Sequence, residues 1–346
     1  GNRVGFTWVR GLVNNIIFLA KDEVETFLPE GRMSKIRFLL EPCVVINPEE
    51  IIDQEAWIRL LGENNPEIIL SAWRMRALPK QVLDEAPNLK YVCYLTGTIR
   101  LVISRSLIEN GLLVTNWGDS ISRTISECAL LLILGCVRKV GYWTQKMHVE
   151  GDWSDASTVT QSLFEKRIGI HGFGMIARKL VPLIRPFSDR ISAFSPGVPQ
   201  SLFDEFDVSR ADSLEVLFSE NDVVVELEAL TEETFRIVSE KLLRSIPPSG
   251  VFVNVGRGSV VDEQALARVA KEGRIQIGLD VYEEEPLSKD SPLRGLDNVL
   301  LLPHIGGPTT DRRVDAGDRA LANLRAYRSG GELKGIIDLD VYDRST

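Results

Sequence analysis

Short apolar runs alternate with amphipathic segments in the part of the chain before Asp119. Between the runs, Glu49–Leu61 and Leu78–Ala86 carry apolar residues at helical spacing. Alternation of this kind predicts an α/β domain with a mainly parallel sheet. The runs typical of strands are Ile16–Leu19, Ile36–Leu40, Cys43–Ile46, Ile68–Leu70, Tyr91–Leu95 and Leu112–Val114.

The stretch Asp119–Met147 has a different pattern, because apolar residues lie on nearly every side of one long predicted helix. Such a helix must be buried between domains or subunits. Its longest apolar run, Ala129–Val137, contains Gly135 and is much shorter than the roughly 20 residues of a membrane span. We therefore expect a soluble protein with no membrane partner.

From Arg167 onward the alternation becomes regular, and six linked strands predict a doubly wound parallel sheet. The helices are predicted at 174–187, 212–219, 239–245 and 262–272, the last with Asp262 as its N-cap. An amphipathic helix at 311–328 and a short C-terminal segment are too small for a domain, so they must pack on an earlier part. The six strands are Arg167–His171, Arg190–Phe194, Asp222–Leu227, Gly250–Val255, Arg274–Leu279 and Asn298–Leu302.

The composition narrows the class of protein. A length of 346 residues predicts two or three domains at roughly 100–200 residues each. Forty basic and 49 acidic residues leave a net charge of −9, which argues against a nucleic-acid or polybasic membrane-surface partner. The four cysteines form no C-x-x-C pair, which indicates reduced thiols in a cytoplasmic protein and no metal site.

A glycine-rich turn follows the strand Arg167–His171 and precedes a predicted helix. It has the pattern G-x-G-x-x-A, which holds a dinucleotide pyrophosphate at a helix N-terminus in many α/β proteins. A turn that binds no nucleotide is the alternative, but the strand before, the helix after and the further repeats favour the cofactor. The residues of the turn are Gly172, Phe173, Gly174, Met175, Ile176 and Ala177.

The acid expected about 20 residues after such a turn, as a ligand of the ribose, is missing. The second strand of this sheet ends at Phe194 and is followed by Ser195, which can make one hydrogen bond to a ribose. No Arg or Lys occurs between 191 and 209, so a clamp for a 2′-phosphate is not evident either. We therefore predict NAD(H) as cofactor, with NADP(H) left open.

Polar residues follow the last three predicted strands, at the edge where open α/β sheets bind ligands. Arg257 comes first, then Asp280 and Glu285, then His304. A guanidinium can hold a substrate carboxylate, an imidazole can transfer a proton near neutral pH, and a carboxylate beside it stabilises the imidazolium. Singly, each could be an ordinary surface residue; on successive strand ends they predict an active site.

Three segments closely resemble signatures of the D-isomer-specific 2-hydroxyacid dehydrogenases: Asn254–Gly258, Gly278–Pro286 and Leu302–Gly307. The resemblance implies an NAD(P)-dependent oxidoreductase that interconverts a 2-keto acid and a D-2-hydroxy acid. It also implies that Arg257 binds the substrate carboxylate and carbonyl, that His304 is the general acid/base, and that Glu285 is its partner. A catalytically weak, nucleotide-sensing protein like the family's corepressors is the alternative.

The resemblance implies an architecture as well. A Rossmann cofactor domain, 119–306, would be inserted into a flavodoxin-like substrate domain formed by 1–118 and 307–346. The apolar helix 121–136 would cross between the domains and form a homodimer through the cofactor domain. The active site would lie between the two domains.

Further contacts are implied at matching positions. Besides the glycine turn and Ser195, the cofactor would meet Val255, Gly256, Asp280, Gly306 and Gly307. The backbone near Gly97 and Thr98 would meet the substrate carboxylate. Three departures stand out: Ser195 in place of an acid, Leu227 and Ala229 in place of His-x-Pro, and Arg100 in the substrate loop. We hypothesise that Arg100, with Arg74 or Arg76, recognises a second anionic group, the alternative being solvated surface arginines.

Overall fold

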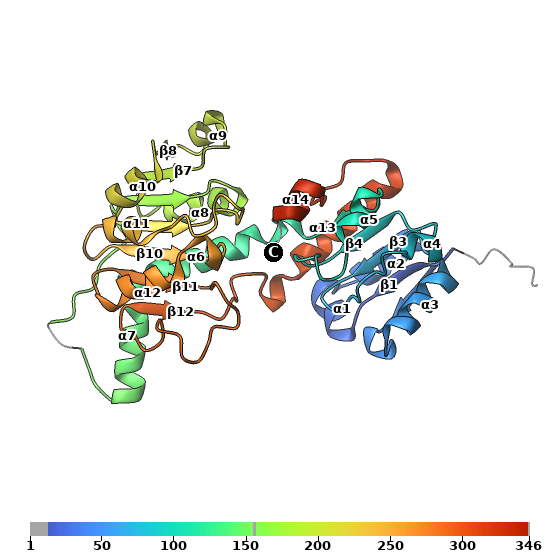
Figure 1. The fold of residues 1–346 in the computed structure, drawn as a ribbon, viewed down its shortest axis with the longest axis horizontal. Coiled ribbons are helices and arrows are strands. Elements are labelled where there is room, and N and C mark those ends of the chain that lie inside the picture. Colours follow the sequence, from blue (N-terminus) through green and yellow to red (C-terminus); the bar gives the residue numbers. More distant parts are fainter. Residues whose placement is uncertain (1–12, 155–156, 345–346) are drawn as a thin grey trace, which may run out of the picture. The chain divides into compact units, whose positions relative to one another are not determined.

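The computed structural model describes residues 13–154 and 157–344, and the chain divides into two compact units (Figure 1). The first unit comprises Gly1–Ile121 and Thr310–Thr346, and the second comprises Ser122–Thr309. The second unit thus interrupts the first. The divisions lie three residues after the boundaries expected from sequence at 118/119 and 306/307.

The first unit is built on a parallel sheet of five strands in the order β2-β1-β3-β4-β5. This order is that of flavodoxin-like folds, which bind ligands at the carboxyl ends of their strands. The strands are β1 (Asn15–Phe18), β2 (Cys43–Ile46), β3 (Ile68–Ser71), β4 (Tyr91–Tyr94) and β5 (Leu113–Thr115).

Alternate residues of these strands enter two separate cores. Ile17 and Leu70 pack with α1 (Lys21–Phe27), α2 (Arg32–Leu40) and α13 (Val314–Ser329). Ile16 and Ile69 pack on the other face with α3 (Gln54–Asn64), α4 (Val82–Glu85), α5 (Arg105–Glu109) and α14 (Leu339–Arg344). The C-terminal segments therefore complete the first unit, on both faces of its sheet. The 3₁₀ turns are η1 (Pro48–Glu50), η2 (Gly118–Ile121) and η5 (Thr310–Arg312).

The second unit has a parallel sheet of seven strands in the order β12-β11-β10-β9-β6-β7-β8. The chain order reverses between β6 and β9, which is the topological switch point of a doubly wound sheet. The strands are β6 (Ile168–His171), β7 (Ile191–Phe194), β8 (Ser209–Arg210), β9 (Val223–Glu226), β10 (Val251–Asn254), β11 (Gln276–Leu279) and β12 (Val299–Leu301).

Helices cover both faces of this sheet. One core contains residues of α6 (Ser122–Val137), α8 (Met175–Ile184) and α9 (Gln200–Glu205), and the other contains residues of α10 (Leu214–Glu220), α11 (Glu240–Ser245) and α12 (Glu263–Lys271). Asp262 accepts a hydrogen bond from the amide of Ala265, which confirms it as the N-cap of α12. A further 3₁₀ turn, η4 (Gly258–Val260), follows β10.

Two predictions of secondary structure are wrong. Ile36–Leu40 is helical rather than extended: Ile36 and Leu40 are fully buried while Phe38 is 76% exposed, so the buried positions repeat at i and i+4. The single helix predicted over Asp119–Met147 is instead η2, α6, α7 (Val140–Gln145) and η3 (Lys146–Glu150). The break lies at Lys139, whose φ of +52° cannot continue a right-handed helix.

Within the described residues, Gly118–Val137 is long and apolar enough to cross a membrane by length and composition alone. The uninterrupted apolar run at Ala129–Val137 is only the last part of this stretch. Most of this stretch is buried inside the protein, as the core helices of soluble proteins are, so it is weak evidence for a membrane span.

Candidate active site

The glycine-rich turn joins β6 to α8 at the carboxyl edge of the second sheet. Gly172 has φ +84°, and a Cβ there would lie 2.7 Å from the backbone N and Cα of Glu228, so the position requires glycine. A Cβ at Gly174, the N-cap of α8, would meet no atom within 4 Å. The turn therefore leaves space at the helix N-terminus, where the first amides can bind a phosphate, and it fits a dinucleotide.

The other predicted cofactor residues near the turn differ in exposure. Phe173 is fully buried and stacks on Phe203 with ring centroids 4.8 Å apart, so it can offer a ligand only its backbone. Met175 and Ile176 open α8, and Met175 is 36% exposed. Ser195, at the end of β7, is 8% exposed, and its carbonyl accepts a hydrogen bond from the amide of Val198.

The loop after β10 carries Val255, Gly256 and Arg257 and is held by Asn254. The Asn254 Oδ1 accepts from the amide of Gly256, and its Nδ2 donates to the carbonyl of Arg257, both at 3.0 Å. In the sequence, Asn254 stood out only as part of a motif; an Asn two residues before a glycine was the available signal. This side chain fixes the backbone on both sides of Gly256.

Glu285 and His304 form a hydrogen-bonded pair. The Nδ1 of His304 lies 2.6 Å from the Oε2 of Glu285, and the Oε1 of Glu285 accepts from the amide of Tyr282 at 3.0 Å. The His304 side chain is 50% exposed. With Nδ1 committed to Glu285, Nε2 is the ring nitrogen that can meet a substrate.

The side chain of Asp280 holds the backbone of the loop that carries His304. One Asp280 oxygen accepts from the amide of Ile305 and the other from the amide of Gly306, each at 2.8 Å. A Cβ on Gly306 would lie 2.7 Å from that carboxylate, so the loop approaches it closely. Burial raises the pKa of Asp280, and the two amide hydrogen bonds oppose that rise. His304 itself has φ +53°, a strained value of the kind that occurs at functional sites.

Arg257 lies within electrostatic reach of this pair. Arg257 is exposed as a whole, and the protein packed around part of it desolvates it and lowers the pKa of Arg257, while the charge of Glu285 acts in the opposite direction. One guanidinium nitrogen donates to the carbonyl of Gly256 at 2.8 Å. The structure therefore brings a cation, a carboxylate and an imidazole together at the carboxyl ends of β10, β11 and β12.

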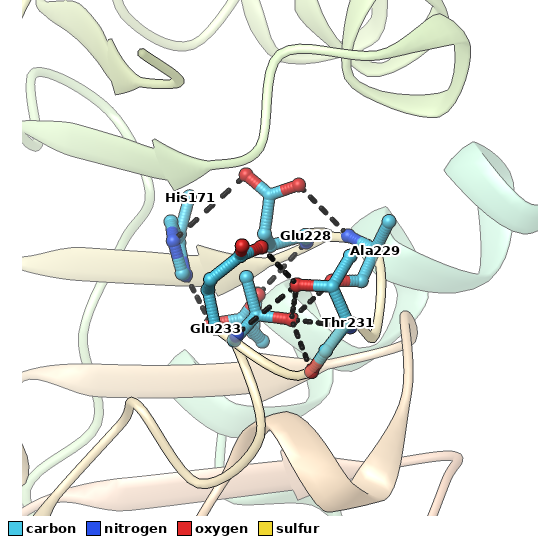
Figure 2. Close-up of polar contacts among 7 residues, drawn as sticks. His171, Glu228, Ala229, Thr231 and Glu233 are labelled. Atoms are coloured by element: carbon cyan, nitrogen blue, oxygen red, sulfur yellow. Dashed lines mark hydrogen bonds and ion pairs between the residues drawn. The ribbon is translucent and has the colours of Figure 1, made fainter. Parts of the chain in front are cut away.

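A second His–Glu pair, His171 with Glu226, lies directly before the glycine turn, and Figure 2 shows its histidine together with Glu228. The Nδ1 of His171 is 2.6 Å from the Oε2 of Glu226, and both side chains are almost completely buried. Burial by itself would lower the pKa of His171, but the charges of Glu226 and Glu228 and the hydrogen bond outweigh it and raise that pKa. In the sequence, His171 was identified only as the last residue of a predicted strand, and its pairing with Glu226 was not predicted.

In the first unit, Gly97 and Thr98 follow β4 at the carboxyl edge of its sheet. A Cβ on Gly97 would lie 2.7 Å from the ring of Trp117, so this ring packs directly on the glycine backbone. Trp117 also meets Trp73 edge to face, with ring centroids 6.2 Å apart. The predicted carboxylate-binding backbone is therefore bordered by indole rings, which the sequence analysis did not identify.

The three arginines considered for a second anion have partners within the first unit. Arg100 donates to the carbonyl oxygens of Tyr342 and Asp343, and its guanidinium lies 5.5 Å from the ring centroid of Tyr342. Arg74 pairs with Asp22, and Arg76 donates to the carbonyl of Ile51. An anionic ligand would compete with these contacts.

Residues 130–306 match the family model described as D-isomer specific 2-hydroxyacid dehydrogenase, NAD binding domain. A glyoxylate reductase of Thermococcus onnurineus is 31% identical over 327 residues, covering 91% of this chain and 94% of that protein.

Solved structures give the same fold. The NAD-complexed D-isomer specific 2-hydroxyacid dehydrogenase of Lactobacillus delbrueckii ssp. bulgaricus has a TM-score of 0.77 at 18% identity, covering 94% of this chain and 100% of that chain. An acyclic imino acid reductase in complex with NADPH and D-Arg has a TM-score of 0.74 at 22% identity, covering 93% and 99%.

Proposed function

The chain belongs to the D-isomer-specific 2-hydroxyacid dehydrogenase family, and from this premise we propose that Arg257, Glu285 and His304 are its catalytic residues. The protein is an NAD(P)-dependent oxidoreductase of 2-keto and 2-hydroxy acids. This assignment rests on the 2.6 Å contact between the Nδ1 of His304 and the Oε2 of Glu285. The charge of Glu285 also acts on the guanidinium of Arg257. No finding favours the alternative of a catalytically weak nucleotide sensor.

In the direction of reduction, protonated His304 donates the proton on Nε2 to the carbonyl oxygen of the keto acid. Glu285 accepts from Nδ1 throughout, which keeps the ring oriented and stabilises the imidazolium. Arg257 holds the substrate carboxylate by a two-pronged hydrogen bond and polarises the neighbouring carbonyl. In the reverse direction, neutral His304 takes the hydroxyl proton through the same Nε2.

The dinucleotide supplies the hydride when it is bound. The glycine turn fits its pyrophosphate, as the space above Gly174 indicates. Asp280 is 1% exposed, and its carboxylate holds the His304 loop through the amides of Ile305 and Gly306. We assign the cofactor contacts to Gly172, Phe173, Gly174, Met175, Ile176, Ser195, Val255, Gly256, Asp280, Gly306 and Gly307.

The function is tested by oxidation of NADH and NADPH with glyoxylate, hydroxypyruvate, pyruvate and phosphohydroxypyruvate. We expect turnover of at least one of them, with the D-2-hydroxy acid as product on chiral chromatography.

Gly97 and Thr98 are proposed to bind the substrate carboxylate through their backbone amides. The same panel with Arg100→Ala should show equal losses on singly and doubly charged keto acids, because Arg100 anchors Tyr342 and Asp343. A larger loss on phosphohydroxypyruvate would instead assign Arg100 to a second anion.

We also propose a homodimer formed through the second unit, in the cytoplasm. The cysteines are free in the described residues, which supports a reducing compartment, and the net charge of −9 favours small-molecule partners over nucleic acid. Sedimentation equilibrium should give twice the mass of one chain; a monomer at micromolar concentration would overturn the dimer. The homodimer is supported by five apolar side chains of the second unit that are 47–75% exposed, namely Leu131, Val140, Met147, Val149 and Trp153.

A further inference from the structure

The ends of β6 and β9 hold a buried network that the proposed chemistry does not use. His171, the last residue of β6, pairs with Glu226, the last residue of β9, directly across the two neighbouring strands. Their side chains are 2% and 0% exposed. The second oxygen of Glu226 accepts from the backbone amide of Glu228 at 2.8 Å, so the pair also fixes the chain that leaves β9.

That chain carries a third ionisable group, Glu228, whose carboxylate is held in one place (Figure 2). One oxygen of Glu228 accepts from the amide of Ala229 at 2.9 Å, and the other lies 4.0 Å from the Nε2 of His171. The side chain is 21% exposed, so part of the carboxylate stays accessible to a ligand. His171 and the Ala229 amide therefore act as positioning groups for a partly exposed carboxylate.

The position of Glu228 in the fold connects it with the cofactor. Its backbone is the part of the chain that a Cβ on Gly172 would strike, so it borders the first glycine of the turn. β6 and β9 flank the topological switch point, and dinucleotides bind in the crevice beyond this point in doubly wound sheets. A ligand whose pyrophosphate sits over Gly174 must pass close to Glu228.

Acidic side chains outnumber basic ones immediately around His171. Glu226 and Glu228 bring two carboxylates against the single imidazole of His171. Arg178 donates to the carbonyl of Gly174, on the pyrophosphate side of the turn. Arg210 donates to the carbonyls of Pro196 and Val198 and lies 5.0 Å from the ring centroid of Phe203.

The end of β7, where an acid usually binds the ribose, offers only the hydroxyl of Ser195. We propose that Glu228 is the acid that selects NAD(H) over NADP(H) in this chain. Its carboxylate accepts a hydrogen bond from a ribose hydroxyl of the adenosine half and repels a 2′-phosphate placed there. The selecting charge then comes from the end of β9 instead of the end of β7. This inference rests on the proposed cofactor contacts of the glycine turn.

The test measures dissociation constants of NADH and NADPH for the full chain by fluorescence titration, without substrate. Wild type should bind NADH at least about tenfold more tightly than NADPH, and Glu228→Gln should narrow that ratio by about tenfold, mainly by a gain for NADPH. Glu232→Gln removes the same charge from an exposed position of the same loop and should keep the wild-type ratio. If Glu228→Gln does not fold, Glu228→Ala is titrated in its place.

The outcomes separate this inference from the proposed function. A wild-type ratio retained in Glu228→Gln, an equal change in Glu232→Gln, or a wild type that prefers NADPH would each overturn the role of Glu228. Failure of both dinucleotides to bind any form would instead overturn the assignment of the glycine turn as the cofactor site.

Discussion

Replacement of His304 by Asn is expected to lower kcat for keto acid reduction by about 10²–10⁴-fold. The substitution removes the group that donates a proton to the carbonyl oxygen. Asn suits the position better than Ala, because His304 has φ +53° and Asn adopts that region more readily than other non-glycine residues. The measurement is steady-state kinetics with the best substrate of the panel, together with a thermal melt to establish that the variant is folded.

Two controls sharpen this experiment. Glu285→Gln keeps an acceptor for the amide of Tyr282 but loses the charge beside the imidazole, so it should reduce kcat less than His304→Asn. The dissociation constant of NADH should stay close to that of wild type in His304→Asn, because His304 is assigned to the substrate. A kcat within about tenfold of wild type would contradict the role of His304 as general acid.

Much of the second unit could be predicted from its sequence because its signals are local. Each of the six predicted strands occurs within two residues of its expected ends, and the glycine turn joins β6 to α8 as its pattern indicates. The contact between His304 and Glu285 could also be anticipated, because the two residues follow neighbouring parallel strands, β12 and β11, at the same edge of one sheet. Local patterns and the rules of parallel sheets were sufficient for these features.

Other features depend on contacts that no local pattern carries. Ile36–Leu40 fits a strand as well as a helix until the exposure of Phe38 distinguishes the two. The two-residue strand β8 and the short helix α14 are too brief for a periodic signal. The pairing of His171 with Glu226 depends on the register of two strands far apart in the chain, and each residue alone was an isolated polar position.

Replacement of His171 by Leu is expected to destabilise the second unit by about 3–5 kcal/mol, because it leaves Glu226 buried without its partner. The double variant His171→Leu/Glu226→Leu removes both groups and should recover most of that loss. It would still leave the amide of Glu228 without the acceptor that Glu226 provides, which costs about 1 kcal/mol. Urea unfolding followed by circular dichroism measures all three proteins.

The pH dependence gives an independent test of the same pair. The pKa of His171 is raised in the folded protein, because the carboxylates of Glu226 and Glu228 outweigh the effect of burial. Protonated His171 therefore contributes stability that is fully present below the ordinary histidine pKa of about 6.5 and is lost as pH rises through the raised value. Relative to the double variant, wild type should lose stability as the pH rises from about 6.5 through this raised pKa. A difference that stays constant over this range would show that His171 does not change its protonation there, and the pair would then be neutral or permanently charged.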